Sequence, residues 1–222
     1  IKIAEGCDNR CSYCIIPYLR GKFRSRQMDD VLYEARMLAA SGVKELIVVA
    51  QDTSRYGTDL PGHKRLLPEL LRQLCQIEDL KWVRVHYVYP DEIDDELIEV
   101  IAAEPKIVKY LDIPIQHCND KILKLMNRRG DGAYLRELFA KLRQRIPGLV
   151  LRTSVITGLP GEGEEAQLLS PTEIFCRLQK KFPAAFRGSN ASHMGKVLMS
   201  LGVERVRTKY GSSYRVVPIA GE

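Results

Sequence analysis

Short apolar runs alternate with amphipathic stretches through the first 160 residues of this 222-residue chain. The apolar runs are typical of buried β-strands, and they occupy residues 1–6, 44–50, 82–88, 109–115 and 149–158. Stretches with helical periodicity lie between and after them, at residues 28–42, 64–77, 91–104, 120–129 and 133–146. Strands that alternate with helices predict a parallel sheet with right-handed crossovers. The pattern therefore predicts an α/β fold, either a partial (βα) TIM-like barrel of about five βα units or a doubly wound open sheet.

Two polar residues stand at the starts of predicted helices and are candidates for their N-caps. Asp91 opens the stretch at 91–104, and Asn119 comes directly before the helix predicted from residue 120. The side-chain oxygens of Asp and Asn accept hydrogen bonds from the free N–H groups of a first helical turn. We therefore expect each to fix the start of its helix.

The pattern changes near residue 163, which divides the chain into a predicted incomplete barrel, 1–163, and a small module, 164–222. Residues 161–171 have the composition of a linker. Two helices are then predicted at 170–183 and 190–202, followed by a hairpin of strands at 203–209 and 213–219. This α+β module is expected to be winged-helix-like. It is also the most basic part of the chain, so nucleic-acid binding through the tail is one candidate function.

Composition restricts the class of protein. The chain has 45% hydrophobic and 28% charged residues and a net charge of +6, as in ordinary globular domains. No apolar run approaches the roughly 18–20 residues that cross a membrane, and the first residues have no signal-peptide pattern. Six cysteines are too few for a disulfide scaffold. We expect a cytoplasmic protein with no membrane partner and, because the chain begins at Ile1, a piece of something longer.

Three of the six cysteines fall within CDNRCSYC, residues 7–14, in a C-x3-C-x2-C pattern. Three thiolates suit a soft metal. A structural zinc site would need a fourth ligand, which His117 or Cys118 could supply. A 4Fe–4S cluster held by three thiolates would instead keep one iron open for another ligand. The pattern follows the first predicted strand, at the carboxyl edge where sites form in barrels. A loop without metal is the third alternative.

Four segments of the chain resemble the radical S-adenosylmethionine methylthiotransferases, most closely the RimO type that modifies a ribosomal protein. The segments are GCDNRCSYCIIPYLRGKFRSR (6–26), VAQDTSRYG (49–57), LDIPIQHCNDKILKLMNRRGD (111–131) and RTSVITGLPGE (152–162). The resemblance covers residues 1–163, and the family's second-cluster domain and TRAM domain lie outside it. The tail instead resembles a small Bacteroidetes module of unknown function.

The resemblance implies a reaction. Cys7, Cys11 and Cys14 would hold a 4Fe–4S cluster, and S-adenosylmethionine would chelate its open iron. One electron, from a donor such as flavodoxin or ferredoxin, would cleave the sulfonium to methionine and a 5′-deoxyadenosyl radical. That radical would start methylthiolation of an aspartate on a small-subunit ribosomal protein, or of tRNA if the chain is closer to the MiaB type. Because the cofactor carries this chemistry, no side chain is predicted as a catalytic acid or base.

The resemblance also implies seven further contacts to S-adenosylmethionine. An aromatic and an apolar residue after the cysteines would pack near the adenine, and two strand-end glutamines would contact the ribose or the methionine moiety. An arginine would meet the carboxylate, and two glycines would let the backbone approach the adenine. These residues are Tyr13, Ile15, Gln51, Gln116, Arg152, Gly158 and Gly161.

Overall fold

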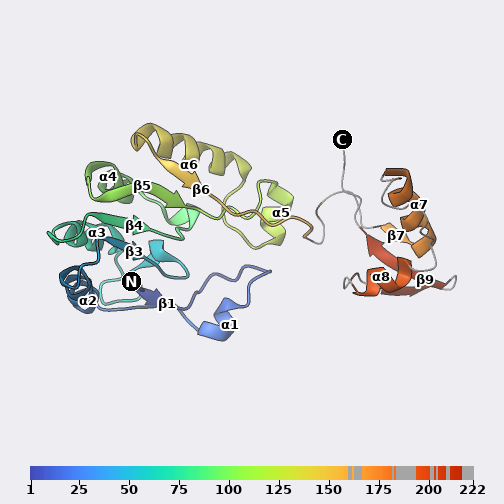
Figure 1. Ribbon diagram of the computed structural model, residues 1–222, viewed down its shortest axis with the longest axis horizontal. Coiled ribbons are helices and arrows are strands. Elements are labelled where there is room, and N and C mark those ends of the chain that lie inside the picture. The colour runs from blue at the N-terminus through green and yellow to red at the C-terminus, as the bar shows by residue number, and fades with distance from the viewer. Residues whose placement is uncertain are drawn as a thin grey trace. The chain divides into compact units, whose positions relative to one another are not determined.

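The computed structural model describes residues 1–159, 162, 167–181, 183, 194–200, 203, 205–208 and 211–216. The chain divides into two compact units, Ile1–Ile156 and Thr157–Glu222 (Figure 1). The boundary predicted from composition, at residue 163, lies a few residues further along the chain. Gly161, one of the residues predicted to bind the cofactor, lies outside the described residues.

Four parallel strands form the sheet of the first unit. They are β3 (Glu45–Val48), β4 (Trp82–Val85), β5 (Ile107–Asp112) and β6 (Val150–Arg152), in the order β3-β4-β5-β6. The first residues extend the sheet beside β3, because Ile3 N donates to Val49 O at 3.0 Å and Val49 N donates to Ile1 O at 3.0 Å. Every neighbour thus follows in chain order. A doubly wound sheet would reverse its order at a switch point, so the partial-barrel prediction is confirmed.

Helices cover one face of this sheet and bury its apolar side chains (Figure 1). They are α2 (Met28–Ala40), α3 (Leu67–Cys75), α4 (Asp95–Ala103) and α6 (Gly132–Arg145), and a shorter helix, α5 (Asp120–Leu125), follows β5. Successive side chains of a strand point to opposite faces. Val48 and Val83 are therefore buried under the helices, whereas Ile47, Trp82 and Val150 are 39%, 50% and 59% exposed.

One of the two predicted helix caps is correct. Asn119 accepts a hydrogen bond from Ile122 N at 3.3 Å and caps α5. Asp91 does not cap α4, because it lies in a short 3-10 turn, η2 (Pro90–Glu92), that precedes the helix. Asp94 is the cap instead, and its Oδ1 accepts from Leu97 N at 2.9 Å.

The first predicted strand, residues 1–6, changes partner along its length and ends at Gly6. β1 (Ala4–Glu5) pairs antiparallel with β2 (Arg24–Ser25), which periodicity did not predict. Gly6 has φ +82°, and a Cβ atom on it would lie 2.2 Å from Lys22 O. Only glycine permits both this backbone conformation and this close approach. The two strands therefore close the base of a loop that contains all three clustered cysteines and the short helix α1 (Ile16–Arg20).

The described part of the second unit contains a three-stranded antiparallel sheet and two helices (Figure 1). Its elements are β7 (Gln167–Leu169), α7 (Pro171–Lys181), α8 (Met194–Ser200), β8 (Arg205–Thr208) and β9 (Gly211–Val216), with sheet order β7-β9-β8. The helix, helix and hairpin of the prediction are present. Strand β7 lies where composition indicated only a linker.

A capping box fixes the start of α7. Ser170 Oγ accepts from Glu173 N at 3.2 Å, and Ser170 N donates to Glu173 Oε2 at 2.7 Å. This is the reciprocal pair expected of an S-x-x-E sequence. These hydrogen bonds lower the pKa of Glu173. The local sequence thus specifies the helix that covers the small core around Phe175 and Tyr214.

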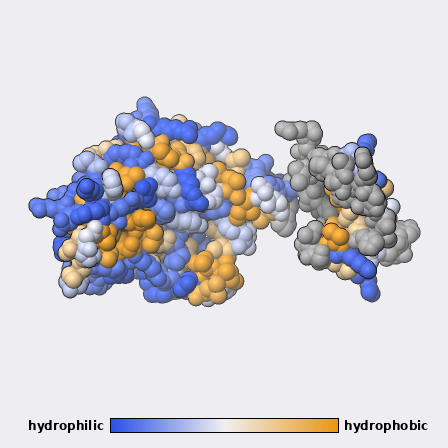
Figure 2. All heavy atoms as spheres, viewed as in Figure 1, coloured by the Kyte–Doolittle hydropathy of each residue, from blue (hydrophilic) through white to orange (hydrophobic). Residues whose placement is uncertain are grey.

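No helix among the described residues is long and apolar enough to cross a membrane. Figure 2 shows that the apolar atoms visible on the first unit form separate patches among hydrophilic ones.

Candidate functional site

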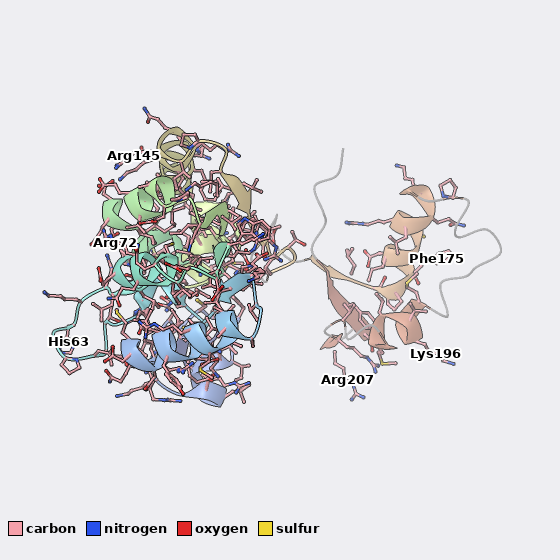
Figure 3. All side chains as sticks on the ribbon, turned by 60° about the vertical axis from the view of Figure 1, so that its left-hand side comes forward. His63, Arg72, Arg145, Phe175, Lys196 and Arg207 are labelled. Atoms are coloured by element: carbon pink, nitrogen blue, oxygen red, sulfur yellow. The ribbon has the colours of Figure 1, made fainter. Side chains whose placement is uncertain are left out.

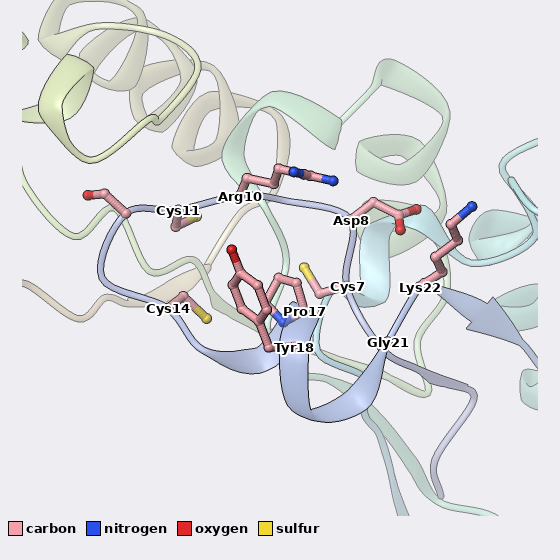
Figure 4. Close-up of a pocket in the computed structure, with 10 residues that line it drawn as sticks. Cys7, Asp8, Arg10, Cys11, Cys14, Pro17, Tyr18, Gly21 and Lys22 are labelled. Carbon is pink, nitrogen blue, oxygen red and sulfur yellow. The ribbon is translucent and has the colours of Figure 1, made fainter.

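The three clustered cysteines line one hollow in the first unit. Backbone bonds shape their loop: Cys7 N donates to Gly21 O at 3.1 Å, and Cys14 N donates to Cys11 O at 3.0 Å. All three thiols are half-buried and none forms a disulfide. They border a cavity of about 470 Å³ whose lining also includes Tyr18 and Lys22 (Figure 4). The three cysteines predicted to share a site therefore line one cavity.

A second cavity, of about 250 Å³, is bordered by the same three thiols and by the strand ends. Its other lining residues include Tyr13, Gln51, Tyr87, Tyr89 and Arg128. The Gln51 side chain donates from Nε2 to Glu5 Oε1 at 3.3 Å, but its Oε1 is buried and has no hydrogen-bond partner. A buried acceptor left unpaired costs free energy. A polar ligand with an N–H or O–H group would satisfy it.

This donor set fits an iron–sulfur cluster with a second, polar ligand. Three thiolates are available within one loop, and the polar residue Gln51 lines the same cavity. Among the residues that the structure describes, no group of three His, Cys, Asp or Glu side chains is arranged to hold a single metal ion. A cubane cluster places each thiolate on a different iron, so its ligands are spread more widely than those of one ion.

A buried hydrogen-bond network ties the cysteine loop to the loops after β3 and β4. Asn9 Nδ2 donates to Asp52 Oδ2 at 2.9 Å, and Ser54 Oγ donates to Asp52 Oδ1 at 2.5 Å. Ser54 Oγ in turn accepts from Tyr89 N at 3.1 Å. Burial raises the pKa of Asp52 and outweighs the hydrogen bonds that lower it. The polar loops that follow successive strands thus converge at one edge, as the βα pattern predicts.

Tyrosines and one arginine surround Cys11. Tyr89 OH lies 3.4 Å from Cys11 Sγ, and the Arg128 guanidinium carbon lies 3.8 Å from the centre of the Tyr89 ring. Burial raises the pKa of Tyr13, Tyr87 and Tyr89, so these hydroxyls stay protonated at neutral pH. Burial also raises the pKa of the Cys7 thiol. The cavity wall near Cys11 therefore offers protonated donors.

The residues predicted to bind the cofactor are only partly brought together. Tyr13 and Gln51 line the second cavity with the cysteines. Ile15 is exposed just before α1 and lines neither cavity, whereas its neighbour Ile16 does. Gln116 is buried with φ +69°, a conformation rare outside glycine, and its N–H donates to Ser154 O at 2.9 Å.

The remaining predicted residues do not line either cavity. Arg152 Nη1 donates to Asp112 Oδ2 at 2.7 Å on the sheet face away from the helices. Gly158 has φ +80° and belongs to the second unit. His117 Nδ1 accepts from Asn119 N at 2.9 Å, and Cys118 is exposed. Neither of the two proposed fourth zinc ligands borders the cysteine cavities.

Sequence reasoning assigned no role to five residues that line the second cavity: Asn9, Ala50, Tyr87, Tyr89 and Arg128. Tyr87 has φ +59°, and strained backbone of this kind clusters at functional sites. Both tyrosines stand at the end of a predicted strand, a position that could have marked them. Arg128 carries no such signal, because a left-handed turn at Asn127, φ +55°, brings it to the site.

A family model described as the radical SAM superfamily matches residues 1–169, and the chain belongs to that superfamily. A second model, a domain of unknown function described from B. Theta (DUF3874), matches residues 159–216. The first match spans the barrel and the cysteine loop, and the second spans most of the C-terminal unit.

The similar curated proteins carry the name ribosomal protein uS12 methylthiotransferase RimO. Those of Anaeromyxobacter sp. (strain Fw109-5) and Myxococcus xanthus are each 58% identical to this chain over 165 residues. That of Alkaliphilus oremlandii is 56% identical over 165 residues. These alignments cover 74% of this chain but only 35%, 34% and 37% of the relatives. The chain thus spans about a third of the length of the relatives it matches.

Solved structures agree at the level of the fold. A radical S-adenosylmethionine methyltransferase, TsrM, from Kitasatospora setae matches with a TM-score of 0.57 and 18% identity, over 82% of this chain and 34% of that one. The cobalamin-dependent S-adenosylmethionine radical enzyme OxsB matches with a TM-score of 0.56 and 12% identity, over 70% of this chain and 23% of that one. At such identities the likeness concerns the fold alone.

Proposed function

We propose that this chain is the cluster-binding core of a RimO-like methylthiotransferase. Cys7, Cys11 and Cys14 hold a 4Fe–4S cluster, and S-adenosylmethionine binds beside it in the cavity that contains Gln51. The observation that carries the proposal is that three free thiols from one loop line the same cavity as the side chains of Tyr13 and Gln51. The identity to RimO proteins across this region supports the same chemistry.

The cluster, when bound, would supply the electron that cleaves S-adenosylmethionine and starts radical chemistry. The residues of the chain would bind, orient and exclude water. Gln51 Oε1 would accept a hydrogen bond from the polar end of the ligand, and Tyr13 would cover the cavity from the loop side. The tyrosine hydroxyls, whose pKa values burial raises further above neutral pH, would donate hydrogen bonds and transfer no proton.

The substrate proposed for the complete enzyme is an aspartate of ribosomal protein uS12, the protein named in the relatives. Methylthiolation of tRNA is the alternative. A one-electron donor of the flavodoxin or ferredoxin kind would reduce the cluster. Because the chain spans a third of its relatives, we propose cluster binding and cleavage of S-adenosylmethionine for this chain itself.

Anaerobic reconstitution with iron and sulfide tests the proposal. We expect about four irons per chain and release of 5′-deoxyadenosine when S-adenosylmethionine and dithionite are added. Cys11→Ala should lose most of the iron, whereas Cys176→Ala is the matched control, because Cys176 is an exposed cysteine of the other unit. Equal iron content in the two variants, or one iron or zinc per chain, would refute a three-thiolate cubane.

A second candidate function, nucleic-acid binding, concerns the C-terminal unit. Its order β7-α7-α8-β8-β9 and its sheet order β7-β9-β8 are those of a winged helix without its first helix. Lys196 on α8 and Arg207 on β8 are exposed and project from the side away from α7 (Figure 3). Arg205 lies two residues before Arg207 on the same face of the hairpin. These three cations form a basic face suited to a phosphate backbone.

Fluorescence anisotropy of the full chain with a short duplex DNA, titrated with salt, tests this second function. Replacement of Lys196, Arg205 and Arg207 by alanine should weaken binding and reduce the slope of log K against log salt by about 3. A control variant with Lys121→Ala and Lys124→Ala removes two exposed lysines from the first unit. Absence of wild-type binding at low salt, or equal losses in both variants, would exclude the tail as the binding surface.

A further inference from the structure

Four successive residues, 126–129, each contact the cysteine loop, although they lie more than a hundred positions further along the chain. Met126 O accepts from Ser12 N at 3.1 Å, and Asn127 Nδ2 donates to Arg10 O at 2.8 Å. The next two contacts also come from side chains. Arg128 Nη1 lies 4.0 Å from Cys11 Sγ, and Arg129 Nη2 donates to Asn9 Oδ1 at 3.4 Å. We call residues 126–129 the support segment.

The end of helix α5 gives the support segment its shape. Met126 N donates to Ile122 O at 2.8 Å and finishes the helix. Asn127 then takes the left-handed conformation, which lets Arg128 N donate back to Leu123 O at 2.9 Å. Asn is one of the few residues that adopt this conformation at a helix end without strain. The backbone therefore directs the Arg128 side chain toward the cysteine loop.

The Arg128 guanidinium is held in place on two sides. Its Nη2 donates to Pro114 O at 2.7 Å, and its central carbon lies over the Tyr89 ring, 3.8 Å from the ring centre. A guanidinium stacks well on an aromatic face and keeps its charge in such a setting. The remaining edge of the group, Nη1, is the one directed at Cys11 Sγ. Tyr89 OH, 3.4 Å from the same sulfur, completes this polar contact.

We propose that Arg128 is a positioning residue that holds Cys11 and stabilises negative charge on its sulfur, which raises the reduction potential of the cluster. The proposal rests on the cluster assigned above. Reduction adds one electron, and therefore one negative charge, to the cluster and its thiolates. A fixed cation beside one thiolate favours the reduced form more than the oxidised form. Charge and hydrogen bonds near the sulfurs are among the factors that set such potentials.

Arg129 provides a matched control, because it carries the same charge one residue away. Its guanidinium pairs with Asp91 at 2.7 Å and Glu92 at 3.1 Å, and it lies 5.9 Å from the Tyr89 ring. Its charge is therefore neutralised locally and is not directed at a cysteine sulfur. Arg128→Met and Arg129→Met both remove one positive charge from the support segment. Only the first removes it from beside Cys11.

The experiment is a potentiometric titration with dithionite of the reconstituted full chain, followed by electron paramagnetic resonance. In Arg128→Met we expect the midpoint to become more negative by about 59 mV, a tenfold change for a one-electron couple. Arg129→Met should titrate like the wild type. Iron and sulfide are measured on every sample, so that a wild-type chain without a cluster refutes the proposed function rather than the role of Arg128.

Three outcomes would overturn the proposal. One is an unchanged midpoint in Arg128→Met at full cluster content, the result expected if Arg128 only packs the loop. Another is an equal shift in Arg129→Met, which would indicate a general charge effect. If Arg128→Met does not retain a cluster, Arg128→Lys decides. Lysine keeps the charge but cannot bond Pro114 O and reach Cys11 Sγ at the same time. We therefore expect a negative shift of the midpoint that is smaller than about 59 mV. An unchanged midpoint in Arg128→Lys would contradict the role proposed for Arg128.

Discussion

Single buried residues determine how the loops meet at the carboxyl edge of the sheet. Asp52 has almost no exposed surface, yet it accepts hydrogen bonds from Asn9 and Ser54, which belong to different loops. A carboxylate in this setting is stabilised by its donors and destabilised by the loss of water. Burial is the larger effect, so the pKa of Asp52 is raised.

The raised pKa of Asp52 predicts a specific pH dependence of stability. The folded state holds the Asp52 proton more tightly than the unfolded state does, so protonation of Asp52 stabilises the fold. This stabilisation is complete below the ordinary pKa of 3.8 and is lost as pH rises through the pKa of the folded state. The substitution Asp52→Asn removes this pH-dependent stabilisation. The free energy of unfolding of the wild type minus that of the variant should therefore fall as pH rises above 3.8. Urea titrations of both proteins across that pH range measure this difference in unfolding free energy. A difference that grows with pH would contradict the prediction.

Cys75 is expected to be the least reactive of the cysteines outside the cluster loop. It is buried in α3, and burial raises its pKa to about 11. At pH 8 only about one thiol in a thousand would be ionised, and the thiolate is the reactive form. Cys118 and Cys176 are exposed. Alkylation of the folded chain followed by mass spectrometry should label these two first, and rapid labelling of Cys75 would show that the core opens.

At the scale of single residues, the sequence predicts the cysteines that would bind a cluster better than it predicts the residues that surround them. The three cysteines are recognisable because their spacing is a local pattern, and Tyr13 follows from the same loop. Arg128 is not recognisable, because its position depends on a left-handed turn at Asn127 and on a partner more than a hundred residues away. The unpaired oxygen of Gln51 is a property of packing, which no residue pattern contains.

Among the elements, the antiparallel pair β1 and β2 is the one that prepares the site. It closes the cysteine loop at Gly6, where the chain passes the backbone of Lys22 too closely for any Cβ atom. The parallel strands were predictable because buried β-strands have a strong apolar pattern. The β1–β2 pair is two residues long on each side and has no periodicity to detect.

Gly6→Ala should open the base of the cysteine loop and lower cluster content. The positive φ costs about 1–2 kcal/mol for alanine, and the clash with Lys22 O adds to it. Gly42→Ala is the matched control, because Gly42 also has positive φ, +101°, but a Cβ atom on it would meet no other atom within 4 Å. We expect Gly42→Ala to lose about 1 kcal/mol of stability and to reconstitute normally. Equal iron content in the two variants would contradict a special role for Gly6.

The molecule as a whole consists of two units with separate cores. The single tryptophan, Trp82, lies in the first unit, and the capping box of Ser170 and Glu173 lies in the second. The change in sequence pattern near residue 163 lies a few residues after the boundary between these units. The sequence pattern did not predict β7, because a three-residue edge strand between acidic and helical segments resembles a linker.

Ser170→Ala should therefore destabilise one unit only. Loss of the cap costs α7 about 1 kcal/mol, and distant sites with no shared contacts behave additively. Denaturation followed by Trp82 fluorescence should keep its midpoint, while helical circular dichroism should lose part of its signal at lower urea. Thr172→Ala is the control, because the cap is formed by Ser170 and Glu173. A shift of the tryptophan midpoint would show that the units unfold together.

The support segment has a consequence for the order in which the site matures. The cysteines leave the ribosome well before Asn127 does. Asn127 bonds to the backbone of the cysteine loop at Arg10, which lies 117 positions earlier in the chain. Contacts between such distant residues form late, because a long loop must close first. The nascent cysteine loop is therefore synthesised long before the residues that hold it. Cluster insertion should follow completion of the barrel, and cysteines exposed until then depend on a reducing environment.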